Sequence, residues 1–571
     1  MLLYGKLLKF FAINVLSERS CCFARNITTK APQMTDNIYS EVISTAQGQL
    51  RGVVRTTVYC DSYYSFEGIP YAKPPLGELR FRAPQPAESW SGIRDCSEIS
   101  NKPVQKNFIT GQIEGSEDCL YLNVYAKTLS SAKPLPVMVW IYGGSFTMGE
   151  GSRRSKGPDY FMKENVILVC FNYRLCSLGF LTLEDPELQV PGNAGLKDQV
   201  LALKWVKKNI AHFNGDDNNI TLFGESAGAA CTHYMSVIEH TRGLFHKAIL
   251  MSGSILNLWA CLPKSNFAYR LAKYHGYTGE NSDCQVLSFL CSLDAAKLVT
   301  HQIMRAEDHH NGCLSPFLPT VEPYVSEDCV IPKKPIEMLQ NVWGNAIPMI
   351  IGGTSFEGLL MYQHIKKNPV GFLKTQPELV LPIEVRRPHS LEENQQLAAK
   401  VLCAHFGENE PSAENMLNHA DIYSYKYFWH GIYRAVMARL AYATIPTYLY
   451  RFDFDSNDFC FHRIKYCGED AASGVAHADD LPFLFYLRES WRLEPETPEY
   501  KTIQRMIGMW TAFAKNSDPN CKKIQPAIWK PLHLDAPYLA LNIANDIEMM
   551  QLPEMEKLMV WDSLYKQEEL F

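Results

Sequence analysis

The segment of this 571-residue chain best suited to do chemistry is Gly224-Glu225-Ser226-Ala227-Gly228, which has the spacing Gly-x-Ser-x-Gly. A serine hydroxyl is a weak nucleophile unless it is exposed and has a base within reach, and a sharp turn from a strand into a helix provides the exposure. An apolar run precedes this turn and small residues follow it. We therefore predict a strand, an elbow and a helix with Ser226 at the elbow, the alternative being a glycine-bracketed turn with an ordinary surface serine.

A base and an acid for this serine are expected in the chain order Ser, then Asp or Glu, then His. Glu357 comes directly after a predicted strand, where an orienting carboxylate is needed, and His477 lies in the small-residue loop 474–480. His477 would accept the Ser226 proton while Glu357 fixes the imidazole tautomer. These residues predict nucleophilic acyl transfer.

Other histidines fit this role less well. His309 and His310 lie in a polar segment predicted to be a loop, and His233 lies one turn into the helix after the elbow. We interpret these three as structural or solvated groups.

Backbone N–H groups should hold the negative charge that develops on the substrate oxygen. One is expected from Ala227, directly after the serine, and the others from Gly144 and Ser145 in the glycine-rich loop 140–146. A plain glycine turn is the alternative interpretation of that loop.

The elements that must position these residues are short apolar runs alternating with helical segments. The runs that predict strands are 120–125, 137–142, 166–173, 220–223, 248–251, 348–352 and 447–452, and those that predict helices are 198–213, 499–513 and 555–565. Such a pattern favours an α/β fold, a large, mainly parallel sheet with helices on both faces, whose active site lies beyond the carboxyl ends of the strands. Residues 41–54 predict an edge hairpin, whereas 66–72 and 84–90 are predicted to be irregular.

Composition limits the classes of function. The content of 46% hydrophobic and 12% aromatic residues allows a large core, and we find no linker or repeat that would divide residues 38–571, so we predict one domain there. A net charge of −6 without a Lys/Arg-rich tract argues against nucleic-acid binding. The 17 cysteines are scattered, with no Cys-x-x-Cys pair, so we expect no metal site and no cofactor, and a reducing compartment.

Residues 1–37 form a separate segment. Leu3, Leu7, Phe10 and Phe11 would share one side of a helix, with Lys6 and Lys9 towards its rim. This arrangement favours a helix in residues 1–16 that lies in a membrane surface, and it predicts an intracellular protein, cytoplasmic or peripheral to endomembranes. A signal peptide followed by a secreted protein is the alternative.

Three motifs together resemble the type-B carboxylesterase and cholinesterase family: Phe223-Gly-Glu-Ser-Ala-Gly-Ala229, Glu117-Asp-Cys-Leu-Tyr-Leu-Asn-Val124 and Tyr142-Gly-Gly. The resemblance covers residues 40–567, and within the family the chain is similar to the insect α-esterases, many of which are intracellular. It implies an α/β-hydrolase fold, the triad named above, a deep gorge, and a small-molecule ester substrate from xenobiotic or lipid metabolism.

The resemblance also implies some finer features. Cys96 and Cys119 match a family disulfide. Residues 102–118 lack the tryptophan that stacks on choline in cholinesterases, so choline specificity is not expected. Cys313 and Ser315 align near the acyl pocket, where bulky aromatics restrict the cholinesterases, which suggests a roomier pocket here. The oligomeric state is not indicated.

Two positions depart from the family pattern, because Ser145 and Cys176 stand where glycine is usual. Ser145 keeps its N–H, but at positive φ it would cost about 1–2 kcal/mol, and loss of one oxyanion donor would cost about 10²–10³ in turnover. Its hydroxyl could instead enter the oxyanion hole or order a water there. The alternative functions are therefore an esterase that sequesters its substrate through slow turnover, and an esterase-like binding protein without catalysis.

Overall fold

A continuous, strongly mixed β-sheet runs through the computed structural model, which describes residues 38–107, 110–310, 313–468 and 473–571. The sheet has 13 strands in the order β1-β2-β3-β7-β9-β8-β10-β11-β12-β13-β14-β15, with β4 paired to β2. The neighbouring strands from β9 through β14 pair in parallel. On both flanks the neighbours in this order pair antiparallel, whereas β4 pairs with β2 in parallel. The centre is thus the parallel sheet that the sequence predicts.

The strand bounds in sheet order are β1 Tyr39–Ser44, β2 Gln49–Thr56, β3 Ser62–Pro70, β7 Tyr121–Ala126, β9 Ile167–Phe171, β8 Leu135–Ile141, β10 Gly215–Glu225, β11 Lys247–Met251, β12 Met349–Thr354, β13 Thr447–Phe452, β14 Leu539–Ile543 and β15 Ile547–Gln551, with β4 at Ile93–Asp95. A separate pair is formed by β5 Gln105–Lys106 and β6 Ile113–Glu114. Each apolar run predicted as a strand is one.

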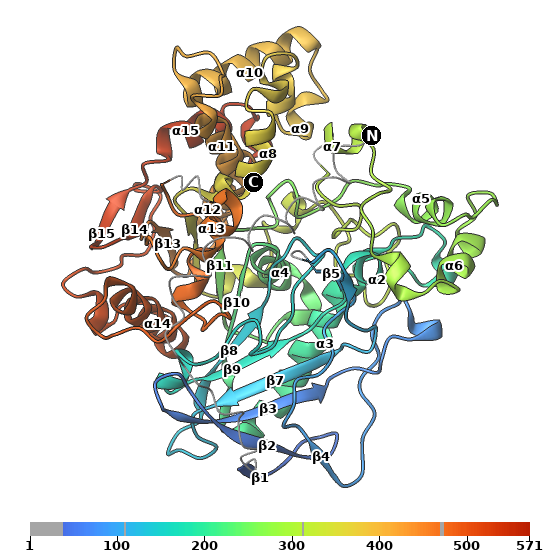
Figure 1. The fold of residues 1–571 in the computed structure, drawn as a ribbon, viewed down its shortest axis with the longest axis vertical. Helices are drawn as coiled ribbons and strands as arrows, with labels where there is room; N and C mark the ends of the chain where they lie inside the picture. Colours follow the sequence, from blue (N-terminus) through green and yellow to red (C-terminus); the bar gives the residue numbers. More distant parts are fainter. Residues whose placement is uncertain (1–37, 108–109, 311–312, 469–472) are drawn as a thin grey trace, which may run out of the picture.

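The helix bounds are α2 Cys176–Phe180, α3 Ala194–Asn209, α4 Ala227–Val237, α5 Phe267–Tyr274, α6 Asp283–Cys291, α7 Ala306–His310, α8 Tyr362–Lys367, α9 Ile383–Arg386, α10 Leu391–Phe406, α11 Met416–Ser424, α12 His430–Tyr442, α13 Phe461–Cys467, α14 Pro498–Asn516 and α15 Met555–Asp562. Figure 1 shows α8 to α11 gathered with α15 at one end of the molecule. Helices α3, α4, α12 and α14 contact the central strands. No helix within the described ranges is long and apolar enough to cross a bilayer.

Burial explains why the central strands read as unbroken apolar runs. Every residue of β9 and of β11 is buried, because helices cover the sheet there. On α14, in the segment 499–513 predicted to be a helix, Ile503, Met506, Trp510 and Phe513 lie along one side and are buried, as expected for core packing.

Two sequence predictions were wrong. Residues 66–72 were expected to be irregular, but most of this stretch belongs to strand β3, where Phe66 is fully buried. Gly68, at φ 70°, and a register shift between Phe66 and Ile69 against β7 break the alternation that would have marked the strand. His309 and His310, predicted in a loop, end the short helix α7.

Two loops at the carboxyl ends of β8 and β9 are fixed to one another. Tyr142 and Tyr173 stack with ring centroids 4.5 Å apart, and each phenol donates to the other's carbonyl at 3.0 Å. Next to Tyr173, the buried Arg174 binds Asp198 of α3 through its backbone N–H and two guanidinium nitrogens, at 2.7–3.0 Å. These contacts fix the loop that follows β8 to the loop that follows β9 and, through Arg174, to helix α3.

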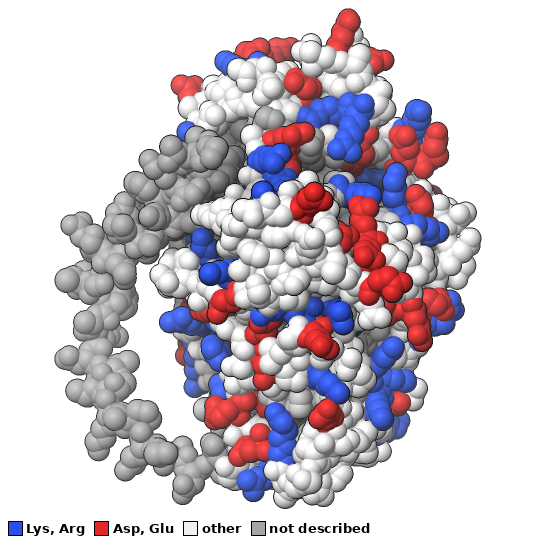
Figure 2. All heavy atoms as spheres, turned by 90° about the vertical axis from the view of Figure 1, so that its right-hand side faces the viewer, with Lys and Arg blue, Asp and Glu red and all other residues white. Residues whose placement is uncertain are grey.

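On the face drawn in Figure 2, Lys and Arg are scattered among Asp and Glu, with larger areas of uncharged residues between them. This mixture agrees with the small net charge of −6. It offers no strongly basic footprint on that face.

The buried pair leads to a stability prediction. Asp198→Asn leaves the Arg174 charge unpaired at a site where the two side chains are 0% and 3% exposed. Because a buried ion that loses its partner is strongly destabilising, we expect a loss of about 3–5 kcal/mol in the free energy of unfolding, measured by urea denaturation. Glu239→Gln, in the exposed pair with Arg242, is the control and should unfold like the wild type; equal losses in the two variants would contradict the prediction.

Candidate active site

The predicted elbow lies between strand β10 and helix α4. Ser226 adopts φ 57° and ψ −124°, a strained conformation for a residue other than glycine, and its N–H donates to the Met251 carbonyl at 2.8 Å. A Cβ on Gly228 would lie 2.1 Å from the Ile141 carbonyl oxygen, and one on Gly224 would lie 2.4 Å from the Gly228 oxygen. The two glycines of the motif are therefore required by the close approach of backbone atoms at the elbow.

Glu357 begins a 3-10 helix, Glu357–Met361, shortly after β12, and is completely buried. Its Oε1 accepts hydrogen bonds from the Ser252 hydroxyl at 2.5 Å and from the Thr354 N–H at 2.8 Å. Its Oε2 lies 2.5 Å from Nδ1 of His477. The carboxylate thus holds the Nδ1 proton in place and leaves Nε2 as the second functional nitrogen of the ring.

His477 is 5% exposed and packs on the ring of Phe428, with centroids 4.5 Å apart. Its Nε2 lies 3.1 Å from Oε1 of Glu225, the residue directly before the elbow serine. Two of the three predicted residues, Glu357 and His477, are therefore in direct contact. Within the described residues no hydrogen bond joins the Ser226 hydroxyl to His477, and such bonds often tighten only when substrate binds.

Glu225 was missed by the sequence analysis. Its only signal was its place in the motif beside Ser226, and a carboxylate there is equally consistent with a strand end. Burial raises its pKa, as does the charge of Glu357, while His477 and Lys156 lower it. Its Oε1 is buried, lies 3.1 Å from His477 Nε2 and makes no hydrogen bond to another described residue.

The imidazole therefore lies between two carboxyl groups. Burial lowers the pKa of His477, but Glu225 and Glu357 outweigh it and raise that pKa to about 9. Asp480, which accepts from the Tyr450 hydroxyl at 3.3 Å, has its pKa raised well above the ordinary range by burial and by the same two glutamates. The site thus stabilises positive charge on the histidine.

The glycine-rich loop predicted to stabilise the oxyanion follows β8 and lies against Ser226. A Cβ on Gly143 would be 3.0 Å from Cβ of Ser226. Gly144, Ser145 and Phe146 all have positive φ, at 112°, 54° and 59°. Ser145 therefore takes the strained conformation considered above, and its side chain is exposed.

The donors of this loop are open. Among the described residues, the backbone hydrogen bonds outside helices and strands do not use the N–H of Gly144 or Ser145, and Ala227 is the first residue of α4, where an N–H has no partner within the helix. Cys176, at φ 52°, supports the loop from below, since its N–H donates to the Phe146 carbonyl at 2.9 Å. The arrangement leaves backbone N–H groups without a partner in the loop that lies against Ser226.

Other predicted residues lie apart from this centre. His233 is buried on α4, where burial lowers its pKa to about 3, and its Nδ1 accepts the Ile255 N–H at 3.4 Å, which fits a structural role. Within the part of the chain that the structure describes, no group of His, Cys, Asp and Glu side chains could hold a metal ion.

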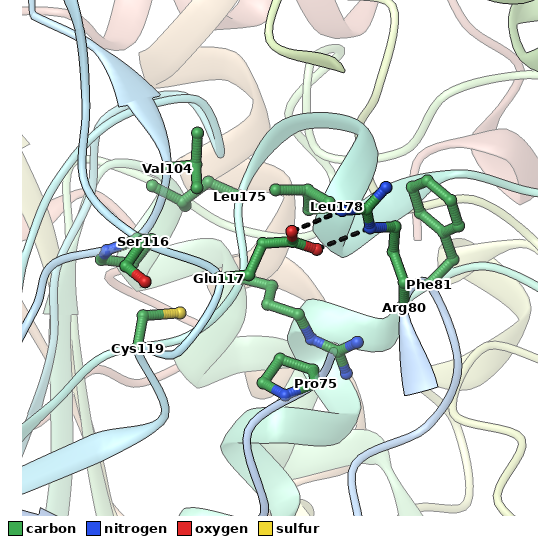
Figure 3. Close-up of a pocket in the computed structure, with 11 residues that line it drawn as sticks. Pro75, Arg80, Phe81, Val104, Ser116, Glu117, Cys119, Leu175 and Leu178 are labelled. Carbon is green, nitrogen blue, oxygen red and sulfur yellow. Dashed lines mark hydrogen bonds and ion pairs between the residues drawn. The ribbon is translucent and has the colours of Figure 1, made fainter. Parts of the chain in front are cut away.

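Cys96 and Cys119 are both buried free thiols in this structure, so the disulfide implied by the family resemblance is not formed in it. Figure 3 shows the Cys119 sulfur beside Ser116 in a small pocket that Cys96 does not line. Burial raises the pKa of Cys96 to about 12 and that of Cys119 well above its usual value, so both thiols stay protonated near neutral pH.

Comparisons with known proteins agree on one family. Residues 39–561 match the model of the carboxylesterase family. Esterase B1 of Culex pipiens is 38% identical over 94% of this chain and all of its own length, and juvenile hormone esterase of Tribolium castaneum is 32% identical over 87% of this chain and 86% of its own. A crystal structure of juvenile hormone esterase from Manduca sexta with OTFP covalently attached superposes with a TM-score of 0.79 at 28% identity, covering 93% of this chain and 100% of that one.

The contact between His477 and Glu225 gives a testable pKa. In Glu225→Gln the imidazolium loses one neighbouring negative charge, so the pKa of His477 should fall by roughly 1–3 pH units. The measurement is an NMR titration of histidine-labelled protein. Asp562→Asn is the matched control, because Asp562 pairs with His430 at 3.0 Å and should leave His477 unchanged. An unchanged or higher His477 pKa in Glu225→Gln would show that the two groups do not interact.

Proposed function

The chain belongs to the carboxylesterase family, has the α/β-hydrolase fold and is a carboxylic ester hydrolase, and on that premise we propose that Ser226, His477 and Glu357 form its catalytic triad. The single observation that best supports this is the 2.5 Å contact between His477 Nδ1 and the buried Glu357 carboxylate, which is the base-orienting half of a triad. Ser226, at the elbow between β10 and α4, is the nucleophile.

The proposed reaction has two steps. His477 Nε2 accepts the Ser226 proton as Oγ attacks the ester carbonyl, and the resulting imidazolium then gives this proton to the leaving alcohol. Water, deprotonated by the same nitrogen, then attacks the acyl-enzyme carbonyl, and the imidazolium returns that proton to Ser226 Oγ as the acyl–oxygen bond breaks and the acid is released. Glu357 and Glu225 stabilise the imidazolium, and N–H groups of Gly144, Ser145 and Ala227 stabilise the oxyanion.

The elevated pKa of His477 fits this charge pattern. Glu225 and Glu357 lie 3.1 Å and 2.5 Å from the two ring nitrogens, so the imidazolium formed in each step is stabilised where it forms. The same stabilisation makes neutral His477, the form that accepts a proton, scarcer at low pH. We therefore propose an enzyme whose activity rises towards alkaline pH.

The substrate class is a small-molecule carboxylic ester. Cys313 and Ser315, which the resemblance places at the acyl pocket, are both buried. They are smaller than the aromatics of cholinesterases, which supports a roomier acyl pocket and esters of xenobiotic or lipid origin.

Residues 1–37, with the membrane-surface helix and the signal peptide as alternatives, lie outside the described residues, so an intracellular location stays a prediction. The named insect relatives include juvenile hormone esterases, which is compatible with a secreted protein.

A second candidate function is sequestration, with fast acylation and slow release. The observation that favours it is the left-handed backbone of Ser145 at a position where the family usually has glycine. Backbone strain of about 1–2 kcal/mol at Ser145 would be relieved if its N–H turned away from the substrate oxyanion, which would slow release of the acyl group. Retention of Ser226, Glu357 and His477 argues against a protein without catalysis.

Ser226→Ala tests the nucleophile. Because the attacking oxygen is removed, kcat on a short-chain 4-nitrophenyl ester should fall by at least about 10³-fold. Ser236→Ala is the matched control and should keep normal turnover: this serine is buried on the same helix, and its hydroxyl donates to the His233 carbonyl at 2.7 Å. Activity of Ser226→Ala within tenfold of the wild type would refute the triad.

Pre-steady-state kinetics separate hydrolysis from sequestration. We expect continued turnover, and Ser145→Gly should keep kcat within about tenfold because both residues present the same N–H. The measurement is stopped-flow release of 4-nitrophenol from the wild type and from Ser145→Gly. A stoichiometric burst followed by almost no steady rate, with a rise of about 10²–10³ in Ser145→Gly, would support sequestration instead.

A further inference from the structure

A single π-helical turn, Tyr425–Trp429, interrupts the run of helix between α11 and α12. Here the N–H of His430 donates to the Tyr425 carbonyl, five residues back. Turns of this kind are rare and poorly stable alone, because the extra residue displaces the hydrogen-bond ladder and leaves carbonyls that need donors from elsewhere. The turn must therefore be held by other side chains.

Those donors come from one loop that follows β11. Asn257 Nδ2 donates to the carbonyls of Tyr427 and Phe428 at 2.7 and 2.9 Å, and Trp259 Nε1 donates to the Tyr427 carbonyl at 2.7 Å. The Asn257 Oδ1 accepts the Ser254 N–H at 2.7 Å, which fixes the orientation of the amide. With an exposed fraction of 4%, Asn257 has no competition from bulk water.

The turn is fitted closely to this asparagine. A Cβ on Gly431 would lie 2.7 Å from Cγ and from Nδ2 of Asn257. The Ser254 hydroxyl lies 2.7 Å from the Gly431 carbonyl, so a further contact joins the same two segments. The amide and the turn therefore form one rigid unit.

The π-turn contacts both His477 and the segment that carries Glu357. The ring of Phe428, inside the turn, packs on the His477 imidazole with centroids 4.5 Å apart. At either end of the turn, Ser424 Oγ accepts the N–H of Gly358 at 2.8 Å, and Trp429 Nε1 donates to the Thr354 carbonyl at 3.0 Å. Gly358 and Thr354 flank Glu357 in the chain, so the turn holds the acid segment as well as the base.

The loop that carries Asn257 also reaches the other triad residues directly. Ser252 donates to Glu357, and a Cβ on Gly253 would lie 2.5 Å from the Ser226 carbonyl oxygen. Loop 252–259 is thus a common support for nucleophile, acid and base.

We infer that Asn257 is a positioning residue for the proposed triad, acting through the π-turn that places Phe428 against His477. The inference rests on the proposed function. Without the amide, the Phe428 carbonyl loses its Asn257 donor and the Tyr427 carbonyl keeps only the Trp259 indole as a side-chain donor. The turn then relaxes towards an ordinary helix, and the Phe428 ring shifts on the imidazole. Small misplacement of a catalytic base lowers turnover strongly while affecting ground-state binding little.

The experiment compares Asn257→Leu with Asn394→Leu. Asn394 is the matched control: it is also 4% exposed and its amide also donates to two carbonyls, those of Arg386 and His389, but it lies on α10. We expect similar losses of thermal stability, with kcat for a 4-nitrophenyl ester reduced about 10- to 100-fold in Asn257→Leu alone and KM changed less than about threefold. Equal kcat values in the two variants would overturn the inference.

A second readout is independent of turnover. The ring current of Phe428 marks the His477 ring signals in NMR of histidine-labelled protein, so Asn257→Leu should shift them and Asn394→Leu should not; unmoved signals in both would again overturn the inference. If Ser226→Ala keeps its activity, the proposed function fails while this readout still reports on the turn.

Two further variants keep the test decisive if Asn257→Leu does not fold. Phe428→Leu removes the ring and keeps the Asn257 and Trp259 donors of the turn, and Trp259→Phe removes one donor while Asn257 stays. Both should shift the His477 signals and lower kcat, the first more than the second. Wild-type signals and kcat in both variants would contradict the inference.

Discussion

A fully buried carboxylate, Glu357, is the constraint on which the site depends. A charge withdrawn from water is tolerated only when donors surround it, and Glu357 has three, from Ser252, Thr354 and His477. Ser252 directly follows β11 and Thr354 ends β12, and these neighbouring strands pair in parallel with Met251 opposite Gly352. The register of the sheet therefore brings the donors to one point, and no local segment could hold this charge by itself.

The parts of the site that the sequence predicted are those determined by local chemistry. Ser226 is marked by glycines that the backbone needs on either side, and Glu357 and His477 by loops after strands, in the chain order that the elbow requires. The central strands were equally clear, because burial on both faces demands unbroken apolar runs. Their existence was predicted well, and their ends less well: β10 begins at Gly215, where Ile220 was expected.

The remaining features depend on contacts between distant segments. Strand β3 is defined by its pairing with β2 and β7. The register shift around Gly68 breaks the alternation of polar and apolar residues, so the local sequence does not predict this strand. The contact of Glu225 with His477 joins the end of β10 to a loop some 250 residues later in the chain, and the π-turn depends on donors from Asn257, 170 residues earlier. Nothing within residues 425–429 distinguishes a π-turn from an ordinary helix.

The oxyanion loop shows how such distant support and local strain belong together. An N–H left open for a substrate cannot take part in regular secondary structure, so the loop that presents it must leave the helix and strand regions of φ and ψ. Ser145 and Phe146 do so at about 1–2 kcal/mol each, without the relief that glycine gives. The strain persists because Cys176, itself left-handed, holds the Phe146 carbonyl, and because Tyr142 and Tyr173 lock the two loops together. Ser145 and Cys176, one in each loop, both stand where glycine is usual. The two loops together, rather than either residue alone, therefore fix the N–H donors of the proposed mechanism.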